Sequence, residues 1–212
     1  MKAFLQYGEG FFVLMAFKKI KQYKIMKKIS TLFKKDPNNL ASVTNEIAPE
    51  NEWAIHSGIA TRKFDGTASA IIDGELYKRY DVKKGREIPA NAIPCQEPDE
   101  ITGHWPHWVK CDRNDKSDRY HFEAFDKLTE KIDDTYELVG PKIQSNPEGY
   151  NEHRLVVHGG DEIELSDRSF ESIKDFLSAA DNDVEGIVFH ANDGTGRMCK
   201  IRKKDFGIKR KK

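Results

Sequence analysis

Cysteine, long apolar runs and internal repeats are scarce or missing in this chain of 212 residues. The three cysteines, Cys95, Cys111 and Cys199, are too few and too odd in number for a disulfide framework, which indicates a reducing compartment such as the cytoplasm. No apolar run approaches the roughly 20 residues that span a bilayer. The apolar opening, residues 3–17, is interrupted by Glu9 and followed rather than preceded by lysines, which excludes a signal peptide.

An excess of charge of one sign is also missing. Lysine plus arginine number 35 and aspartate plus glutamate number 35, so the net charge does not indicate a polyanionic partner. The cations are unevenly distributed, however, with clusters at residues 18–35 and 200–212. Each cluster could be a solvated tail or a surface that contacts phosphates.

No low-complexity linker divides the chain, which favours one globular domain, residues 50–212, behind a basic N-terminal arm, residues 1–49. The globular pattern begins near Trp53, and a basic helix is expected over residues 17–33 of the arm. Because a more ordinary segment opens at Met26, we interpret the residues before it as an upstream extension.

Apolar periodicity then predicts a succession of strands with few helices. The expected strands lie at residues 59–62, 67–72, 75–80, 135–141, 154–160, 184–189 and 198–202. The expected helices lie at residues 120–131 and 170–177, the second with Asp167 or Ser166 as its N-cap. Strands outnumber helices and several are joined by short turns, so the predicted class is α+β with largely antiparallel sheets.

The polar stretch at residues 89–118 is predicted to be a long ordered loop. Trp105 and Trp108 within it either anchor the loop or stack on nucleic-acid bases, and anchoring is the favoured interpretation. A possible zinc set has spacings that match no common finger, so ordinary loop residues are favoured there. Its members are Cys95, His104, His107 and Cys111. His158, after an apolar strand, is interpreted as a core or edge histidine.

The candidate nucleophile is Lys63, which lies between a strand and an Asp-Gly turn at Asp65 and Gly66. A lysine amine attacks only when its charged form is destabilised by neighbouring cations or by partial burial. Arg62 is adjacent in sequence. Further cations that could serve are Arg79, Lys84, Arg86, Lys200 and Arg202. The alternative is an exposed turn without function, because a short motif often occurs by chance.

Four ionisable residues interrupt otherwise apolar strand patterns: Glu137, Glu185, Lys200 and Arg202. Charges at such positions are costly unless they are paired or functional. Phosphoryl or nucleotidyl transfer needs these residue types together, because cations hold the phosphates, one carboxylate binds a metal ion and another accepts hydrogen bonds from ribose hydroxyls.

Four segments, in order, resemble the motifs of the covalent nucleotidyltransferases, the superfamily of ATP-dependent ligases and messenger RNA capping enzymes. They are Lys63-Phe64-Asp65-Gly66, Tyr136-Glu137-Leu138-Val139-Gly140, Val184-Glu185-Gly186-Ile187-Val188-Phe189 and Lys200-Ile201-Arg202. The resemblance covers roughly residues 53–207. Longer strings are similar to the small stand-alone 5′-to-3′ RNA ligases, namely residues 77–81, 93–97, 102–106 and 137–144.

This resemblance implies an ATP-grasp-like nucleotidyltransferase (ligase adenylylation) domain with flanking helices. It implies that Lys63 attacks the α-phosphate of ATP to give a lysyl-AMP, that the AMP passes to an RNA 5′-phosphate, and that a 3′-hydroxyl displaces it in RNA repair. Glu185 would hold Mg²⁺ or Mn²⁺ and Glu137 the ribose. The remaining nucleotide contacts would be Thr61, Arg62, Asp65, Gly66, Arg79, Arg86, Lys200 and Arg202.

The chain departs from the family pattern at three points. Ala68 stands where many relatives have an arginine, so that contact comes from elsewhere or is absent. Arg62 stands where relatives often have an acidic residue, which puts adenine recognition in doubt, although an adjacent cation could help to lower the pKa of the Lys63 amine. Too few residues follow the fifth motif for a C-terminal oligonucleotide-binding (OB) domain. The lid and RNA-gripping roles would then fall to the arm, the loop at residues 89–118 or the basic tail at residues 203–212.

The sequence therefore predicts a monomeric, ATP-dependent RNA ligase. A DNA ligase core and a capping-type guanylyltransferase are the alternatives among enzymes, and nucleotide and nucleic-acid competition would separate them. A nucleic-acid-binding module without catalysis is the alternative from another class, and it would bind with a steep salt dependence.

Overall fold

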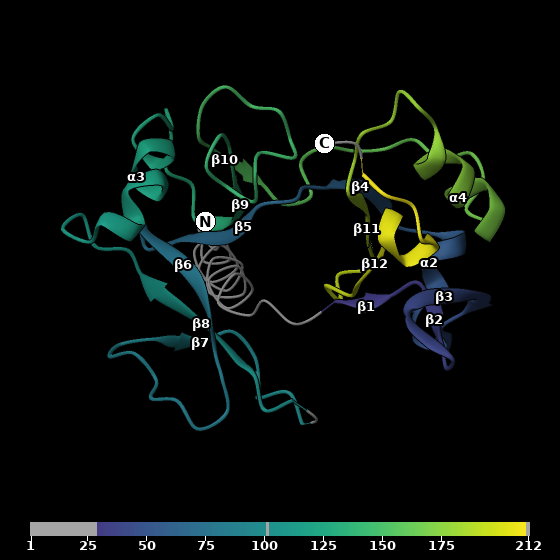
Figure 1. The fold of residues 1–212 in the computed structure, drawn as a ribbon, viewed down its shortest axis with the longest axis horizontal. Helices are drawn as coiled ribbons and strands as arrows, with labels where there is room; N and C mark the ends of the chain where they lie inside the picture. Colours follow the sequence, from purple (N-terminus) through teal and green to yellow (C-terminus); the bar gives the residue numbers. More distant parts are fainter. Residues whose placement is uncertain (1–28, 101, 211–212) are drawn as a thin grey trace, which may run out of the picture. The chain divides into compact units, whose positions relative to one another are not determined.

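A computed structural model of the chain describes residues 29–100 and 102–210, in two compact units (Figure 1). Of these residues, Ala68–Tyr136 form the first unit, and residues 29–67 together with Glu137 onward form the second. The sequence pattern did not reveal this division because the chain passes between the units inside β5 and β9, where no linker composition marks a boundary.

The second unit is built on a four-stranded sheet in the order β1-β12-β11-β4. Its strands are β1 (Ser30–Thr31), β4 (Ile59–Lys63), β11 (Gly186–His190) and β12 (Met198–Arg202). β11 pairs antiparallel with both β4 and β12, whereas β1 pairs parallel with β12. The two C-terminal strands and β4 lie where the alternation of apolar residues predicted them.

One face of this sheet is the core of the second unit. Alternate residues of the three long strands, Ala60, Ile187, Phe189, Cys199 and Ile201, are buried together in one hydrophobic cluster. Because successive strand residues point to opposite faces, the residues between them must occupy the other face. The short helix α2 (Trp53–His56) and helix α4 (Phe170–Ser178) add Ala54, Ile173 and Leu177 to the cluster.

Helix α4 confirms the predicted helix, but its N-cap is Ser169 rather than Asp167 or Ser166. The Ser169 hydroxyl accepts a hydrogen bond from the Ser172 backbone nitrogen at 3.4 Å. Asp167 instead accepts hydrogen bonds from the backbone nitrogen and hydroxyl of Ser169, at 2.9 and 2.7 Å. The carboxylate therefore orients the capping residue and does not cap the helix itself.

The globular part begins earlier than Trp53. In the described part of the expected arm, β1, the hairpin strands β2 (Phe33–Asp36) and β3 (Asn39–Ile47), and the short helix η1 (Pro49–Asn51) all belong to the second unit. Leu32 and Phe33 are buried in its core. The expected basic helix at residues 17–33 is wrong for residues 30–33, which are strand or bend, while residues 17–28 and Met26 lie outside the described residues.

The first unit contains a sheet with the order β9-β5-β6-β8-β7, in which β6 pairs antiparallel with β5 and β8, and β7 pairs antiparallel with β8. Its strands are β5 (Thr67–Ile72), β6 (Glu75–Val82), β7 (Ile93–Pro94), β8 (Trp105–Lys110) and the beginning of β9 (Asp134–Val139). The end of β9 belongs to the second unit, as does β10 (Arg154–Val157). A small core of Ala70, Ile72, Cys95 and Trp108 supports this sheet.

Residues 89–118 are not simply a loop, because they contribute β7, β8 and the short helix η2 (Lys116–Asp118). Trp108 is fully buried, and the indole nitrogen of Trp105 donates a 2.6 Å hydrogen bond to the Gln96 carbonyl. Anchoring, rather than base stacking, is therefore what Trp108 does in this structure. Apart from β7, residues 83–104 remain loop, turn or bend where they are described.

Helix α3 (Arg119–Phe125) is shorter than the helix expected at residues 120–131. The chain turns away after Phe125 because Asp133 binds the β5–β6 turn, accepting hydrogen bonds from the backbone nitrogens of Asp73 and Gly74 at 2.8 and 2.9 Å. Ile132, expected on the buried face, is largely exposed.

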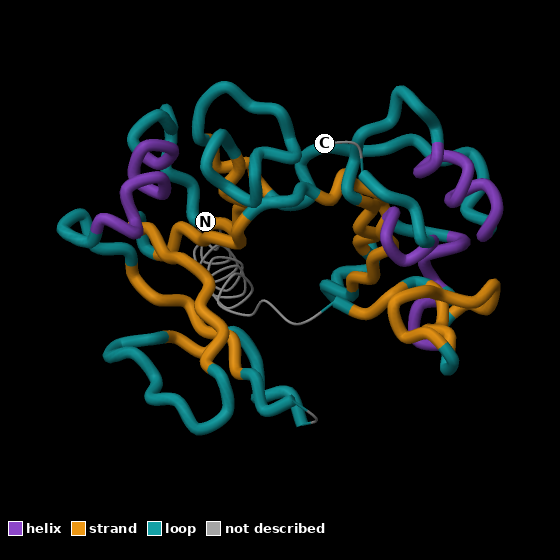
Figure 2. Tube along the Cα trace, in the orientation of Figure 1, coloured by secondary structure: helices purple, strands orange, loops and turns teal. Residues whose placement is uncertain are grey.

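The predicted class, α+β with largely antiparallel sheets, is confirmed. Strands and connecting loops make up most of both units, and the helices are short (Figure 2). Among residues 29–100 and 102–210, no helix has the length and apolar character needed to cross a membrane.

Two leucines of the expected arm test whether residues 30–47 are part of the folded unit. Leu32 is 0% exposed and Leu40 is 73% exposed. We expect Leu32→Ala to lower the free energy of unfolding by about 2–5 kcal/mol, because it leaves a cavity in the core. Leu40→Ala is the matched control and should have little effect in the same urea titration followed by circular dichroism. Equal effects of the two substitutions would contradict the core assignment.

Candidate active site

The polar face of the β4-β11-β12 sheet carries the residues that the motifs single out. The strand register places Lys63, Gly186 and Arg202 in one row across the three strands. It places Thr61, Val188 and Lys200 in the next row on the same face. Cross-strand neighbours share a face, so two lysines and an arginine meet opposite the apolar core.

Gly186 leaves space in the row between Lys63 and Arg202. A Cβ atom at this position would lie 2.3 Å from the Ile201 carbonyl oxygen and 2.8 Å from the Arg202 Cα. These are backbone atoms of the neighbouring strand and cannot move without opening the ladder. A side chain here is therefore incompatible with the register that brings Lys63 and Arg202 together.

Lys63 ends β4 with its amine against Glu185, the residue that precedes β11. The Lys63 Nζ lies 2.6 Å from the Glu185 Oε2 and 3.3 Å from the Phe64 carbonyl oxygen. Burial raises the pKa of Glu185 and the nearby Asp65 carboxylate raises it further, whereas Lys63 and Arg202 oppose the rise. A nucleophile candidate and the expected metal ligand are thus in direct contact.

Lys200 is a half-buried cation on the same face. Burial, and then the charges of Arg202 and Lys63, lower the pKa of Lys200 to about 8. Among the residues that the structure describes, no hydrogen-bond partner of its side chain is found, so the ammonium remains available to an anion. A phosphate group at this position would relieve the repulsion among the three cations.

Arg202, in contrast, is already engaged. Its Nε and one terminal nitrogen donate hydrogen bonds to the two carboxylate oxygens of Asp205, at 3.0 and 2.9 Å. The Asp205 side chain is buried and also pairs with Lys35 at 2.7 Å. Arg202 thus contributes positive charge to the site while its fork is held by Asp205 at the start of η3 (Lys203–Phe206).

Two carboxylates hold the loop that follows Lys63. Glu137, in β9, accepts a hydrogen bond from the Gly66 backbone nitrogen at 3.0 Å, and Glu148 accepts one from the Asp65 backbone nitrogen at 2.8 Å. A Cβ atom at Gly66 would lie 2.2 Å from the Leu138 carbonyl oxygen. A glycine at position 66 is therefore required for the loop to approach β9.

Glu148 is the centre of a buried charge cluster that the sequence did not reveal. Its side chain is 0% exposed and contacts Arg62 and Arg210, the latter at 2.9 Å. Arg210 also donates to the Asp183 carbonyl oxygen at 2.6 Å and lies 3.7 Å from the Asp65 carboxylate. Two arginines from distant segments thus converge on the carboxylate that fixes the nucleophile loop.

No local pattern could have singled out these residues. Glu148 lies in a polar loop after Asn146-Pro147, and Arg210 lies within a run of lysines and arginines. Glu148 and Arg210 are 62 positions apart in the sequence, so their contact depends on two distant segments folding together. Arg62, which the sequence placed beside the nucleotide, is tied to Glu148 instead.

Two histidines contact residues that the motifs single out. The His158 Nε2 lies 2.9 Å from the Glu137 Oε2, and the His190 Nε2 lies 3.0 Å from the Thr61 hydroxyl. His158 was expected to be a satisfied core or edge histidine, and its partner is the carboxylate of a motif residue, Glu137. The available signal was its position directly after a buried strand and before two glycines.

Two of the expected nucleotide contacts are residues of the first unit. Arg79 and Arg86 are in the first unit, Arg79 paired with Asp81 at 3.2 Å and Arg86 exposed in the turn after β6. The proposed zinc set of Cys95, His104, His107 and Cys111 does not form a cluster of metal-ligating atoms among the described residues.

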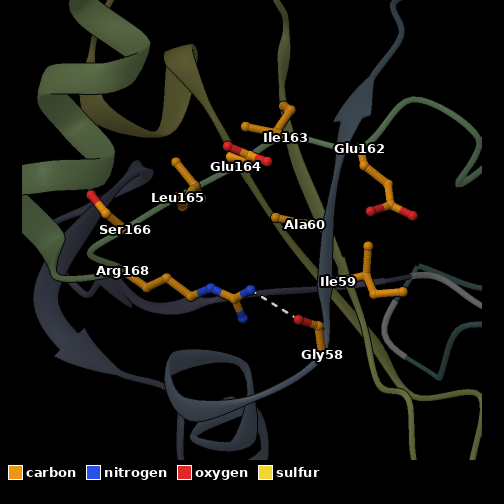
Figure 3. A pocket seen from close by; sticks show the side chains of 9 residues that line it. All are labelled: Gly58, Ile59, Ala60, Glu162, Ile163, Glu164, Leu165, Ser166 and Arg168. Carbon is orange, nitrogen blue, oxygen red and sulfur yellow. Dashed lines mark hydrogen bonds between the residues drawn. The ribbon is translucent and has the colours of Figure 1, made fainter.

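A depression on the second unit lies at the other end of β4 from Lys63 (Figure 3). Its lining residues are Gly58, Ile59, Ala60, Glu162, Ile163, Glu164, Leu165, Ser166 and Arg168. Arg168 donates hydrogen bonds to the carbonyl oxygens of Ala54 and Gly58, at 2.7 and 2.9 Å. These bonds attach the segment before α4 to the end of α2, which accounts for the arginine structurally.

The motifs and their arrangement resemble those of RNA ligases of the nucleotidyltransferase type, and a comparison with protein families supports this resemblance. The family model described as RNA ligase 1 matches residues 124–212. That range includes Glu137, Glu148, Glu185 and Lys200, but not Lys63.

Particular relatives carry the same name. RNA ligase 1 of Pongo abelii is 28% identical over 229 aligned residues, which cover 73% of this chain and 69% of the relative. RNA ligase 1 of Rattus norvegicus is 28% identical over 160 residues, and that of Mus musculus is 27% identical over 160. For both rodent proteins the match covers 57% of this chain and 47% of the relative, so the chain spans about half their length.

Substitution of Glu148 should destabilise the protein. In Glu148→Gln the two arginines lose a buried ionic partner, and removing one member of a buried pair costs about 3–5 kcal/mol. The measurement is the free energy of unfolding in urea. Glu46→Gln, which removes an exposed ion pair with Lys34, is the matched control and should change little. A Glu148→Gln protein as stable as the control would contradict the cluster's role.

The buried charge of Lys200 should make stability depend on pH. Its pKa is about 8 in the folded protein, against an ordinary value of 10.5. Between these values the unfolded chain binds a proton that the folded chain lacks, so the free energy of unfolding rises with pH. Lys200→Met should therefore be more stable than the wild type at pH ~7, and the advantage should shrink as the pH rises above about 8. A constant difference in urea titrations across this range would contradict the assignment.

Proposed function

We propose that this protein is an ATP-dependent RNA ligase that uses Lys63 as its nucleophile. The observation that carries the proposal is the contact between Lys63 and Glu185 on a sheet face that also bears Lys200 and Arg202. A lone lysine in a turn would explain none of these neighbours. The names of the similar proteins support RNA as the substrate.

In the first step, the Lys63 nitrogen attacks the α-phosphorus of ATP. A nitrogen–phosphorus bond forms, the bond from the α-phosphorus to the bridging oxygen breaks, and pyrophosphate leaves. The attacking amine must be neutral, so its extra proton has to depart first. Glu185 contacts the Lys63 Nζ and is the carboxylate placed to receive that proton.

Lys200 is the cation best placed to bind phosphate, because its side chain is not committed to a carboxylate by a hydrogen bond among the described residues. Arg202 adds charge but is held by Asp205. Arg79 and Arg86 remain proposed phosphate contacts in the first unit. The arginine missing at Ala68 has a possible substitute in Arg210, which lies near the nucleophile loop at Asp65.

Glu137 was predicted to bind the ribose. One of its carboxylate oxygens now accepts the Gly66 backbone nitrogen and the other contacts His158. A ribose hydroxyl could still share these oxygens, because each has two lone pairs. We propose that Glu137 both holds the nucleophile loop and orients the sugar. Thr61, in the row next to that of Lys63, is the further proposed nucleotide contact.

Glu185 and Asp65 fit a divalent cation of the Mg²⁺ or Mn²⁺ type. They are carboxylates close enough for Asp65 to raise the pKa of Glu185, and such cations prefer oxygen ligands. When bound, the cation would neutralise charge on the phosphates and the leaving pyrophosphate.

The later steps follow from the same chemistry. The lysyl-AMP would be attacked at phosphorus by an RNA 5′-phosphate oxygen, which releases Lys63 and gives an adenylylated RNA end. A 3′-hydroxyl would then attack the RNA phosphorus, form the phosphodiester and release AMP. We propose a monomer with a nucleotidyltransferase fold for this reaction.

The nucleophile is tested with ATP labelled at the α-phosphate in the presence of Mg²⁺. The wild type should acquire acid-labile label, and both Lys63→Ala and Lys63→Arg should fall to background, since neither keeps an attacking amine. Lys204→Ala, at an exposed lysine of the same unit, is the control and should label like the wild type. Equal labelling of wild type and Lys63→Ala would overturn the assignment.

The same assay separates the alternatives. A capping-type guanylyltransferase would label from GTP rather than ATP, and a DNA ligase core would pass the label to nicked DNA in preference to broken RNA. A nucleic-acid-binding module would never be labelled but would bind with strong salt dependence.

A further inference from the structure

A second cluster of reactive side chains lies in the first unit and takes no part in the proposed ligation. Cys111 follows β8, Asp118 ends η2 as the residue before α3, and His121 lies in the first turns of α3. One ligand atom from each, the thiol sulfur, a carboxylate oxygen and a ring nitrogen, lies within 4.8 Å of the other two. All three residues are buried.

His121 is the feature that needs an explanation. It is 7% exposed, and both its ring nitrogens are buried without a hydrogen-bond partner among the described residues. Buried polar atoms in folded proteins nearly always have a partner, and an exception is often the site of a water molecule or an ion. An imidazole nitrogen that accepts no hydrogen bond can offer its lone pair to a metal ion.

The other two members suit the same ion. Cysteine sulfur, imidazole nitrogen and carboxylate oxygen are the three kinds of ligand that zinc accepts. Tetrahedral zinc needs such atoms about 3.5 Å apart, so the cluster would close by about 1 Å at its widest. The Asp118 Oδ2 accepts a hydrogen bond from the Asp112 backbone nitrogen at 3.0 Å, and this bond orients the carboxylate as ligand-supporting contacts do.

Lys78 currently supplies positive charge to this cluster. Its ammonium contacts the Asp118 carboxylate and lies 3.8 Å from the Asp115 carboxylate. The side chain is on β6 and is partly exposed, so it can withdraw toward solvent when a metal ion takes its place. A lysine beside a carboxylate, a thiol and an unpartnered histidine marks a position where a cation is favoured.

The other buried cysteines show that burial alone does not create such a cluster. Cys95 in the same unit and Cys199 in the second unit are both buried, as is Cys111. Among the described residues only Cys111 belongs to a group of potential ligands.

We propose that Cys111, Asp118 and His121 form a binding site for Zn²⁺, with water as the fourth ligand. Binding would release the thiol proton of Cys111 to solvent and form the sulfur–zinc bond, with no change in oxidation state. The bound ion would tie the end of β8 to the beginning of α3 and so stabilise the first unit. None of its three ligands has a role in the proposed ligation, and all three belong to the first unit.

The experiment uses the full chain without a histidine tag, stripped with a chelator and titrated with Zn²⁺ against a chromophoric chelator. Wild type and Cys95→Ser should bind one ion per chain, and Cys111→Ser and His121→Ala should bind at least ~10-fold more weakly. With Co²⁺, wild type and Cys95→Ser should show a thiolate-to-metal absorption band that Cys111→Ser lacks.

A further variant distinguishes ion binding from loss of folding. Lys78→Met removes the competing ammonium and should bind Zn²⁺ more tightly than the wild type, an effect that damage to the fold would not produce. Absence of Zn²⁺ binding by the wild type would overturn the proposal. So would equal binding by wild type, Cys111→Ser and His121→Ala, or weaker binding by Lys78→Met.

Discussion

The backbone register of β4 against β11 and β12 is the constraint from which the site follows. It sets Lys63 opposite Gly186 and Arg202, and Thr61 opposite Val188 and Lys200. A slip by one residue would send these polar side chains into the core and Ala60, Ile187 and Ile201 to the other face. The burial of the apolar face therefore fixes the chemistry of the opposite one.

The charged residues near these three strands fall into two groups, one partly exposed to solvent and one buried. The partly exposed group consists of the amine of Lys63, the carboxylate of Glu185 and the ammonium of Lys200. In the buried group, carboxylates hold the cations and backbone nitrogens that position the first group, as Glu148 holds Arg62 and Asp65. A buried carboxylate is tolerated only with several donors, and each of these has them.

The sequence predicted the parts of this arrangement that are local. Alternating apolar residues located β4, β5, β11 and β12, and the charges that broke the alternation were Glu137, Glu185, Lys200 and Arg202. Contacts between distant segments were not predictable, because nothing near Glu148 or Arg210 reports their pairing. The strands before Trp53 were not predicted, because Leu32 and Phe33 are consecutive buried residues and show neither strand nor helix periodicity. Helix α3 was predicted to be too long, because the sequence pattern does not show that Asp133 binds the β5–β6 turn.

The place of Arg210 in the chain has a consequence for synthesis. Lys63 and Glu148 leave the ribosome well before the arginine that neutralises Glu148, and Arg210 follows every strand of the second unit. Until translation reaches it, the nascent second unit contains a carboxylate with an incomplete set of donors. Along the chain, the nucleophile loop thus gains the support of Arg210 only after every strand of the second unit has been synthesised.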